Sequence, residues 1–324
     1  MRTISLPKIE TNERVAAAVL DGLTEMPKRL PPWLFYDDAG SRLFEKITRL
    51  PEYYPTRTER SILVRHATAI IARAASGSRL RIAELGAGSA DKTRLLLKAA
   101  VARHGAAIYE PIDVSATALD AARRRIEREI AGVTVRPQVA DYTEGFAMEP
   151  TATGERRLVL YIGSSIGNFE PHEALRLLKR VRAGLNAGDA ILLGVDLVKD
   201  EATLVAAYDD AEGVTAAFNR NLLARLNREL GADFDLDWFA HRAIWNPEQS
   251  RIEMHLESET RQRVRLETLG IELNFETNET IHTENSYKYR AGEAESMLDK
   301  AGFAPVGSWK DARSWFEVCL GRAR

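Results

Sequence analysis

The most constraining feature of the chain is an alternation, from about residue 80 onward, of short apolar runs with amphipathic helical segments. Such an alternation is typical of βαβ units, in which the strands lie parallel and helices cover the faces of the sheet. The expected strands are residues 80–85, 107–113, 134–140, 157–163 and 189–196, with helices at 91–104 and 115–130. The pattern therefore predicts a doubly wound α/β sheet.

The pattern changes after residue 196. A long helical stretch, 197–230, leads into a β-rich region, 242–275, in which Asn246-Pro247 predicts a hairpin turn. Antiparallel strands do not extend a parallel sheet naturally, so we expect an inserted α+β domain. A helix and the closing strands of the first sheet are then expected within 290–309 and 314–321. The predicted domains are 61–197 with 287–324, and 1–60 with 198–286.

Composition excludes some classes of function. Among 324 residues, 45 Lys and Arg nearly balance 47 Asp and Glu, so no strong field favours nucleic acid or an anionic membrane. We expect Arg123–Arg125 to be a solvated helix face. The N-terminus lacks the apolar core of a signal peptide and no transmembrane-length apolar run occurs, which favours the cytoplasm.

Metal chemistry and disulfides are not indicated by the sequence. The only cysteine, Cys319, lies in an apparent buried strand and is interpreted as a packed core thiol. The six histidines show no spacing typical of metal ligands, so we expect no metal site.

A glycine loop, AELGAGSADKTRLLL, occupies residues 83–97. Gly86 and Gly88 are predicted to turn the chain after a buried strand, and Lys92 to lie in the first turns of the next helix. Dinucleotide-binding loops carry Gly or Ala at the third position of this motif, where the present chain has Asp91. A carboxylate there repels a pyrophosphate, whereas S-adenosylmethionine carries no phosphate. The loop therefore favours S-adenosylmethionine.

Carboxylates follow the ends of successive predicted strands, where ligands of doubly wound sheets bind. Glu84 ends the first strand and Asp113 the second, and Asp113 is placed to accept both ribose hydroxyls. The alternative is that the segment Asp113-Val-Ser115 only caps the following helix. Asp141-Tyr142 follows the third strand and suits an adenine amino group and ring, with a surface turn as the alternative.

A fourth strand end carries the segment YIGSSIGNFEP, residues 161–171. Gly163 and Gly167 permit close backbone approach, and the neutral amide of Asn168 can bind a small polar substrate. The Asn/Asp-Pro-Pro-aromatic motif of enzymes that methylate exocyclic base amines is absent. The acceptor is therefore expected not to be nucleic acid.

From about residue 20 to its C-terminus, the chain resembles the histidine-specific Nα-methyltransferases of ergothioneine biosynthesis, which form hercynine. The resemblance rests on the segments FYDDAGSRLFEKITRLPEYYPTRTE, ELGAGSADKTR, GSSIGNF, LLGVDLVKD, AYDDAEGVTAAFNRN, ELGADFDLDWF, RIEMHL and HTENSYKY. It implies a Rossmann-like class I methyltransferase domain with an inserted substrate-binding domain. It also implies S-adenosylmethionine as methyl donor and trimethylation of the α-amino group of L-histidine.

The resemblance also implies roles for individual residues, carried over motif by motif. The implied cofactor contacts are Gly86, Lys92, Asp113, Asp141 and Tyr142. The implied contacts of the amino acid's α-amino and carboxylate groups are Tyr53, Asn168 and Tyr208. Glu284 and Ser286 are implied to recognise the imidazole, and Met254 to form the wall beside its ring. Tyr36 and Phe44 are implied to be further pocket residues. Tyr36 and Asn168 are the implied catalytic residues; water or Tyr36 could pass the proton, and no His or Lys stands out as the base.

Three alternatives remain open from the sequence. A related methyltransferase for tryptophan or another amino acid would keep the cofactor residues but is disfavoured by Glu284 and Met254. A nicotinamide oxidoreductase is disfavoured by Asp91, and a non-catalytic binding module by the retained site residues. We expect a monomer that binds a small molecule, L-histidine, and neither nucleic acid nor a membrane.

Overall fold

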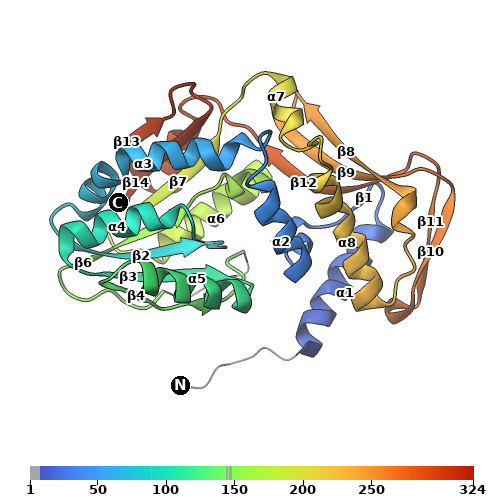
Figure 1. Cartoon of the computed structure of the whole chain (residues 1–324), viewed down its shortest axis with the longest axis horizontal. Helices are drawn as coiled ribbons and strands as arrows, with labels where there is room; N and C mark the ends of the chain where they lie inside the picture. The colour runs from blue at the N-terminus through green and yellow to red at the C-terminus, as the bar shows by residue number, and fades with distance from the viewer. Residues whose placement is uncertain (1–7, 89, 144, 146–147) are drawn as a thin grey trace. The chain divides into compact units, whose positions relative to one another are not determined.

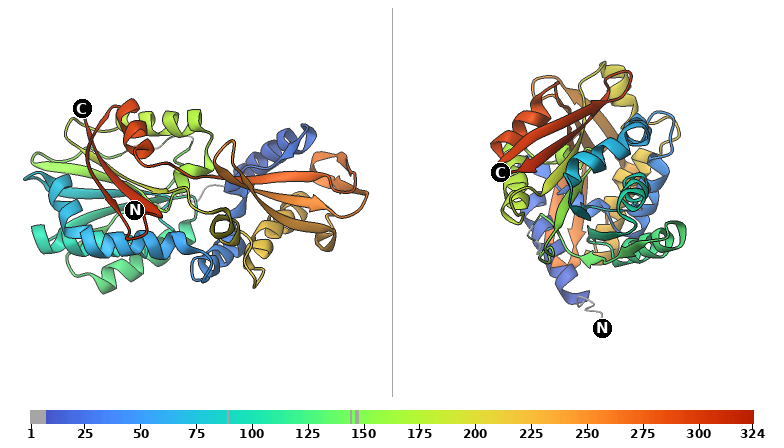
Figure 2. Two further views of the ribbon diagram at one scale, coloured as in Figure 1. Left: turned by 90° about the horizontal axis from the view of Figure 1, so that it is seen from above. Right: turned by 90° about the vertical axis from the view of Figure 1, so that its left-hand side faces the viewer.

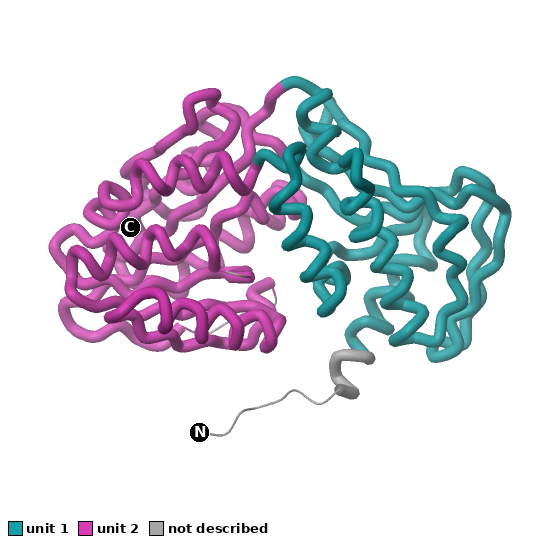
Figure 3. Tube along the Cα trace, viewed as in Figure 1, with its two compact units in different colours: residues 1–54, 200–286 teal, residues 55–199, 287–324 magenta. Residues whose placement is uncertain are grey.

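The computed structural model describes residues 8–88, 90–143, 145 and 148–324 (Figure 1). The chain divides into two compact units, each built from two separate segments (Figure 3). Unit 1 comprises Met1–Tyr54 and Asp200–Ser286, and unit 2 comprises Pro55–Lys199 and Tyr287–Arg324. The domain boundaries expected from the sequence stay a prediction, and the two units are described separately below.

Unit 2 contains a mixed sheet with the strand order β13-β14-β7-β6-β2-β3-β4. The strands β4, β3, β2, β6 and β7 pair in parallel, whereas β14 is antiparallel to both β7 and β13. The strand bounds are β2 Arg79–Leu85, β3 Ala107–Asp113, β4 Val133–Val135, β6 Glu155–Tyr161, β7 Ala190–Asp196, β13 Phe303–Lys310 and β14 Phe316–Ala323. This topology confirms the predicted doubly wound α/β fold and its closing strands.

Helices cover both faces of this sheet (Figure 2). Because side chains alternate along a strand, Ile82 packs on one face and its neighbour Ala83 on the other. The first face is covered by α3 (Tyr54–Ala75), α4 (Thr93–His104) and α5 (Ala116–Glu129). The second is covered by α6 (Pro171–Ala183) and α9 (Glu293–Lys300). Cys319 is fully buried on the second face, as expected of a core thiol.

Two details of unit 2 differ from the prediction. The strand expected at 134–140 is broken into β4 and the short β5 (Gln138–Val139), which flank Arg136-Pro137. Proline has no N–H to give to a ladder, which explains the break. The helix expected from residue 91 begins at Thr93, so Lys92 is its N-terminal flanking residue rather than part of its first turn.

Unit 1 contains a second sheet with the order β1-β12-β9-β8, and a separate β10-β11 pair. The strand bounds are β1 Lys28–Arg29, β8 Phe239–Asn246, β9 Arg251–Ser258, β10 Gln262–Leu266, β11 Ile271–Phe275 and β12 Thr280–Tyr287. Asn246 pairs with Arg251 at the end of the β8-β9 hairpin, which confirms the turn predicted at Asn246-Pro247.

The helices of unit 1 come from both of its segments. Their bounds are α1 Lys8–Thr24, α2 Asp38–Ile47, α7 Glu201–Ala206 and α8 Val214–Leu230, with the short turns η1 Pro32–Phe35, η3 Leu236–Trp238 and η4 Glu267–Leu269. The prediction of one long helical stretch at 197–230 was wrong. The chain breaks between α7 and α8, where Gly213 adopts a left-handed conformation with φ of 71°. No helix among the described residues is long and apolar enough to cross a membrane.

Candidate functional site

The glycine loop follows β2 directly and turns the chain through two left-handed residues. Gly86 has φ of 65° and Gly88 has φ of 49°, conformations that favour glycine. A Cβ at Gly86 would lie 3.5 Å from the ring of Tyr142, whereas one at Gly88 would meet nothing within 4 Å. The predicted contacts Gly86 and Tyr142 therefore lie together. Ser89 of the same loop lies outside the described residues.

Asp113 ends β3 and braces the glycine loop. Its carboxylate accepts a hydrogen bond from the backbone N–H of Gly88 at 3.0 Å and another from that of Ser115 at 3.0 Å. Ser115, rather than Asp113, caps α5 by accepting from the N–H of Ala118 at 3.1 Å. The cap that the alternative expected from Asp113-Val-Ser115 is therefore present, with Ser115 as the capping residue, and the ribose contact of Asp113 stays a prediction.

Asp141 and Tyr142 follow β5. The Asp141 carboxylate accepts from the backbone N–H and the hydroxyl of Thr143, at 2.7 and 2.6 Å. Burial raises the pKa of Tyr142 to about 12, so its phenol stays neutral, and its ring makes an edge contact with Tyr161 at 5.7 Å between centroids. We refer to Gly86, Lys92, Asp113, Asp141 and Tyr142 together as the carboxylate edge.

Lys92 lies against a buried carboxylate that no strand-end pattern in the sequence indicates. Its ammonium forms an ion pair with Glu59 of α3, which is fully buried. Both oxygens of Glu59 also accept from the backbone N–H of Gly163, at 2.9 and 3.0 Å. Glu59 thus joins the lysine of the carboxylate edge to the loop that leads to Asn168. The one sequence signal for Glu59 was that it ends the segment PTRTE, which is part of the family resemblance.

The donors and acceptors at this edge fit S-adenosylmethionine. Two carboxylates, Asp113 and Asp141, can accept from ribose hydroxyls and an adenine amino group, and Lys92 can pair with a carboxylate. Asp91 of the same glycine loop is not among these residues. Its carboxylate forms ion pairs with Arg94, at 2.6 Å, and with Arg125. Arg125 therefore braces the loop from α5, which corrects the expectation that all of 123–125 is a solvated face.

Glu84 is a second buried carboxylate beneath the loop. It accepts hydrogen bonds from the hydroxyls of Thr93, at 2.7 and 2.8 Å, and of Tyr109. Burial raises the pKa of Glu84 to about 7, against the effect of these hydrogen bonds and of Lys92. Its hydrogen bonds hold the start of α4 against β2 and β3, which is a structural role.

Asn168 ends a short helical turn, η2 (Ser165–Asn168), that follows β6. Gly163 has φ of 86°, and a Cβ at Gly167 would lie 2.8 Å from the backbone oxygen of Tyr287. Both glycines of this segment are therefore required by backbone geometry, and the close approach of a substrate to them stays a prediction. Asn168 is half-buried.

Unit 1 gathers most of the remaining predicted residues into one set of ring contacts. The centroids of Tyr36 and Phe44 are 5.8 Å apart, those of Phe44 and Tyr53 6.2 Å, and those of Tyr53 and Tyr208 6.2 Å. Each pair meets edge to face, an arrangement that aromatic rings prefer. Phe218 joins the set, with its centroid 6.0 Å from those of Tyr36 and Phe44. We call these five residues the aromatic cluster.

The aromatic cluster connects to β12 through a hydroxyl contact. The Tyr208 hydroxyl lies 2.6 Å from Oγ of Ser286. The backbone oxygen of Tyr208 lies 2.8 Å from Nε2 of His241, whose Nδ1 lies 2.9 Å from the side-chain amide of Asn219. Tyr208 is therefore held from both its backbone and its hydroxyl.

Glu284 and Met254 lie on neighbouring strands of the same sheet. Met254 is buried on β9, and its backbone oxygen accepts from the hydroxyl of Thr283 at 3.0 Å. Glu284 and Ser286 are buried on β12, at 9% and 4% exposure. The side-chain oxygen of Asn285 accepts a hydrogen bond from Nε2 of His282 at 2.8 Å. The edge-strand surface alternative for Glu284 is therefore wrong, because β12 is a buried strand between β1 and β9.

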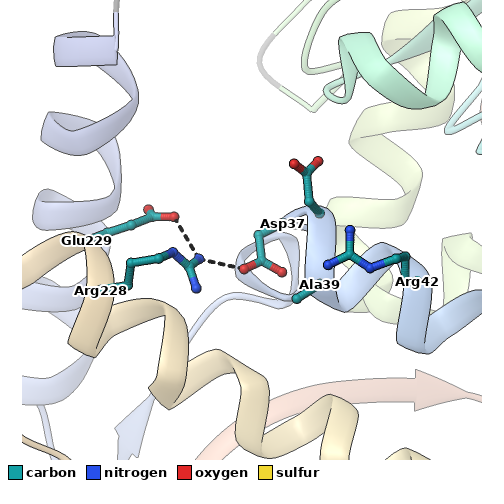
Figure 4. Close-up of a pocket in the computed structure, with 6 residues that line it drawn as sticks. Asp37, Ala39, Arg42, Arg228 and Glu229 are labelled. Carbon is teal, nitrogen blue, oxygen red and sulfur yellow. Dashed lines mark hydrogen bonds and ion pairs between the residues drawn. The ribbon is translucent and has the colours of Figure 1, made fainter.

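Unit 1 also has a polar hollow of about 410 Å³ lined by Asp37, Asp38, Ala39, Arg42, Arg228 and Glu229 (Figure 4). Its charges are largely paired, since Arg228 lies 2.6 Å from Asp37 and 3.4 Å from Glu229. Burial alone would raise the pKa of Asp37, but hydrogen bonds from Gly40, Asn221 and Arg228 lower it. None of the predicted site residues lines this hollow, and we assign it no function.

One cluster in unit 2 has atoms spaced for a metal ion. Ligand atoms of Glu295, Glu317 and Cys319 lie within 4.8 Å of one another. Burial raises the pKa of the Cys319 thiol to about 12, and metals bind the thiolate. Glu317 already accepts from the Ser308 hydroxyl. The cluster therefore gives no reason to propose a metal.

Comparison with known proteins matches residues 15–323 to a family model described as histidine-specific methyltransferase, SAM-dependent. The histidine N-alpha-methyltransferase of Mycobacterium tuberculosis is 45% identical over 302 residues, 93% of this chain and 92% of that protein. The protein of the same name from Mycolicibacterium smegmatis is 44% identical over 98% of this chain and 99% of its own length. Ergothioneine biosynthesis protein 1 of Neurospora crassa is 33% identical over 92% of this chain and 34% of that protein.

Proposed function

Since the chain belongs to the family of histidine-specific, S-adenosylmethionine-dependent methyltransferases, we propose that it trimethylates the α-amino group of L-histidine. The product is hercynine, and the reaction is the first step of ergothioneine biosynthesis. The choice of acceptor is based on the ring contacts that connect Tyr36 to Tyr208. The Tyr208 hydroxyl in turn contacts Ser286, which is two residues from Glu284. This combination offers neutral aromatic faces together with a buried carboxylate.

The carboxylate edge is proposed to hold the methyl donor. Lys92 would pair with the methionyl carboxylate, Asp113 would accept from the ribose hydroxyls, and Asp141 would accept from the adenine amino group. Tyr142 beside Gly86 would cover the adenine ring. When bound, S-adenosylmethionine supplies a methyl group on a sulfonium, which is an activated leaving group.

The residues of the acceptor site are proposed to orient a neutral amine. Tyr53, Asn168 and Tyr208 would hold the α-amino and carboxylate groups without adding a fixed charge. Alignment of this kind supplies about 7–11 kcal/mol of a barrier. The aromatic cluster also favours the quaternary ammonium that forms, because cations are attracted to ring faces.

A proton must leave before each transfer, because an α-amine is mostly protonated near neutral pH. We propose that Tyr36, directly or through water, passes this proton. Its ring belongs to the aromatic cluster, 6.0 Å from that of Phe218 between centroids. A Tyr36→Phe variant that methylates at the wild-type rate from acid to alkaline pH would contradict this role.

Glu284 is proposed to select histidine. An imidazole has an N–H that a carboxylate can accept, and Ser286 can adapt to the other ring nitrogen. Met254 would bound the ring. A tryptophan side chain lacks the second ring nitrogen that Ser286 would contact and has a larger ring, so this pair of polar groups and the wall at Met254 disfavour it.

The test is a panel of free amino acids with S-adenosylmethionine, read by product mass. Histidine should gain three methyl groups. The proposal fails if histidine is unchanged while tryptophan or another amino acid is methylated, and calorimetry with NAD distinguishes the oxidoreductase alternative. The cytoplasmic location and monomeric state stay predictions, which cell fractionation and light scattering would check.

A further inference from the structure

The segment Tyr287–Tyr289 follows Ser286 directly in the chain and is the first part of unit 2 after the crossing from unit 1. It belongs to the segment HTENSYKY, of which only Glu284 and Ser286 have a proposed role so far. We call Tyr287–Tyr289 the anchor segment. Its contacts within unit 2 involve the Asn168 loop and the end of β7.

The anchor segment lies tightly against the loop that carries Asn168. A Cβ at Gly167 would lie 2.8 Å from the backbone oxygen of Tyr287 and 3.2 Å from its nitrogen, so no side chain fits between the two backbones. The Tyr287 hydroxyl donates to Glu170 at 2.6 Å. These contacts lie on both sides of Asn168 in the chain.

A buried charge cluster fixes the next residue. The ammonium of Lys288 lies 2.9 Å from Oδ2 of Asp196, and that of Lys199 lies 2.6 Å from Oδ1. The side chains of Lys288, Lys199 and Asp196 are 0%, 3% and 1% exposed. Burying charges in this way is costly unless they are paired, so the geometry of the cluster is strongly specified.

Backbone hydrogen bonds fix the end of the segment. The N–H of Tyr289 donates to the oxygen of Asp196 at 2.9 Å, and the N–H of Val198 donates to the oxygen of Tyr289 at 2.9 Å. The N–H of Asp196 in turn donates to Oγ of Ser164 at 2.9 Å. Asp196 therefore connects the anchor segment to the start of the Asn168 loop as well.

We propose that Lys288 is a positioning residue for the amino-acid substrate. Through Asp196 it fixes the anchor segment, which continues the chain directly from Glu284 and Ser286, against the loop of Asn168 within unit 2. This inference rests on the proposed function, because it assumes that Ser286, Glu284 and Asn168 bind the acceptor. It assigns Lys288 no contact with the substrate.

The cluster makes Lys288→Met an informative variant. Two lysines share one carboxylate, so removing Lys288 leaves Asp196 still paired with Lys199 rather than as an isolated buried charge. The matched control is Lys28→Met. Lys28 on β1 forms a partly buried ion pair with Glu279, the residue that precedes β12, at the opposite end of the same strand.

The experiment measures the KM for histidine, kcat, and the affinity for S-adenosylhomocysteine by calorimetry on the full chain. Lys288→Met should raise the histidine KM by about tenfold or more, because small displacements of positioning groups have large kinetic effects. Its affinity for S-adenosylhomocysteine should stay within about twofold of wild type, and Lys28→Met should change neither quantity by more than that.

An unchanged histidine KM in folded Lys288→Met would overturn the proposal, as would an equal loss of both affinities. Tyr287→Phe provides a second variant, since it removes only the hydroxyl bond to Glu170 and keeps the ring. It should raise the histidine KM by about threefold, the effect of losing one modest hydrogen bond, and no change would also count against the proposal.

Failure of the proposed function is recognised separately, in the wild-type protein alone. If another amino acid is the acceptor, the panel above identifies it. The KM values of Lys288→Met and Lys28→Met are then compared for that acceptor, and the comparison still decides the role of Lys288.

Discussion

The carboxylate edge of unit 2 and the aromatic cluster of unit 1 are built in different ways. The carboxylate edge takes its residues from consecutive strand ends, between Gly86 and Tyr142, and relies on charges and backbone N–H groups. The aromatic cluster takes neutral rings from three separate stretches of chain, near residues 36–53, 208 and 218. Topology alone therefore brings the first set together, whereas the second depends on tertiary packing.

The largest effect is expected when the buried carboxylate of Glu284 is removed from the acceptor residues of unit 1. Glu284→Ala should raise the histidine KM by about 10³-fold, because a buried imidazole N–H then lacks its acceptor. S-adenosylhomocysteine binding, measured by calorimetry, should be unchanged. Glu253→Ala on β9 of the same sheet is the control, since Glu253 is paired with Arg251 at 2.8 Å and has no proposed role. Equal losses of both ligands in Glu284→Ala would remove the distinction between the two regions.

Glu284 is proposed to bind the substrate, whereas Glu84 is a buried carboxylate with a structural role. It lies beneath the glycine loop of unit 2, and its effect is expected on stability rather than on binding. Its pKa is raised from 4.5 to about 7, so the folded state binds more protons than the unfolded state between these values. The stabilisation is complete below pH 4.5 and is lost as the pH rises through 7. The loss amounts to about 3 kcal/mol at 1.36 kcal/mol per unit of pKa.

Urea unfolding of wild type and Glu84→Gln between pH 4.5 and 8 measures how the free energy of unfolding of each protein changes with pH. The variant has no ionisable group at this position, so its stability relative to wild type should rise with pH. A constant difference across this range would show that Glu84 ionises at its ordinary pKa.

A smaller effect is expected at the glycine loop. Gly86→Ala places a Cβ at φ of 65° beside Tyr142 and should weaken S-adenosylhomocysteine binding by about tenfold, with the histidine KM unchanged. Gly105→Ala is the matched control. Gly105 also has a positive φ, 78°, but lies at the end of α4 with nothing within 4 Å of a Cβ. The two variants should lose similar stability, and only Gly86→Ala should lose cofactor affinity.

The smallest effect is expected for the hydroxyl that joins the aromatic cluster to β12. Tyr208→Phe removes the contact with Ser286 and should raise the histidine KM by about fivefold, as for one neutral hydrogen bond. Ser286→Ala should have a similar effect. If the two groups act as a pair, the double variant should resemble the single variants. Fully additive effects would mean that they act independently.

The sequence predicted what periodicity and strand ends determine. The parallel strands, the closing β13-β14 pair and the Asn246-Pro247 hairpin follow from local patterns, and the structure confirms them. Gly86, Asp113 and Tyr142 could be proposed as cofactor contacts because strand ends meet at one edge of a sheet, and their contacts stay predictions. The family resemblance, rather than any local pattern, supplied Tyr36, Tyr53 and Tyr208.

Other features depend on contacts that no local pattern records. Glu59 reaches Lys92 and Gly163 from a helix that precedes the sheet, so its role requires the packed structure. Phe218 is one of several apolar residues on α8, and its spacing alone does not distinguish it from core. Lys288 carried no signal because its partner, Asp196, lies far away in the chain.

The position of β14 between β7 and β13 has a consequence for the order of folding. β7 ends at Asp196, but its neighbour β14 begins only at Phe316, after the whole second segment of unit 1. Until then the edge of a fully buried, apolar strand has no partner on that side, and such edges invite pairing with other chains. Late closure of long-range pairs also slows folding. The sheet of unit 2 therefore closes after the chain of unit 1 has been made, and aggregation during synthesis is expected to begin at β7.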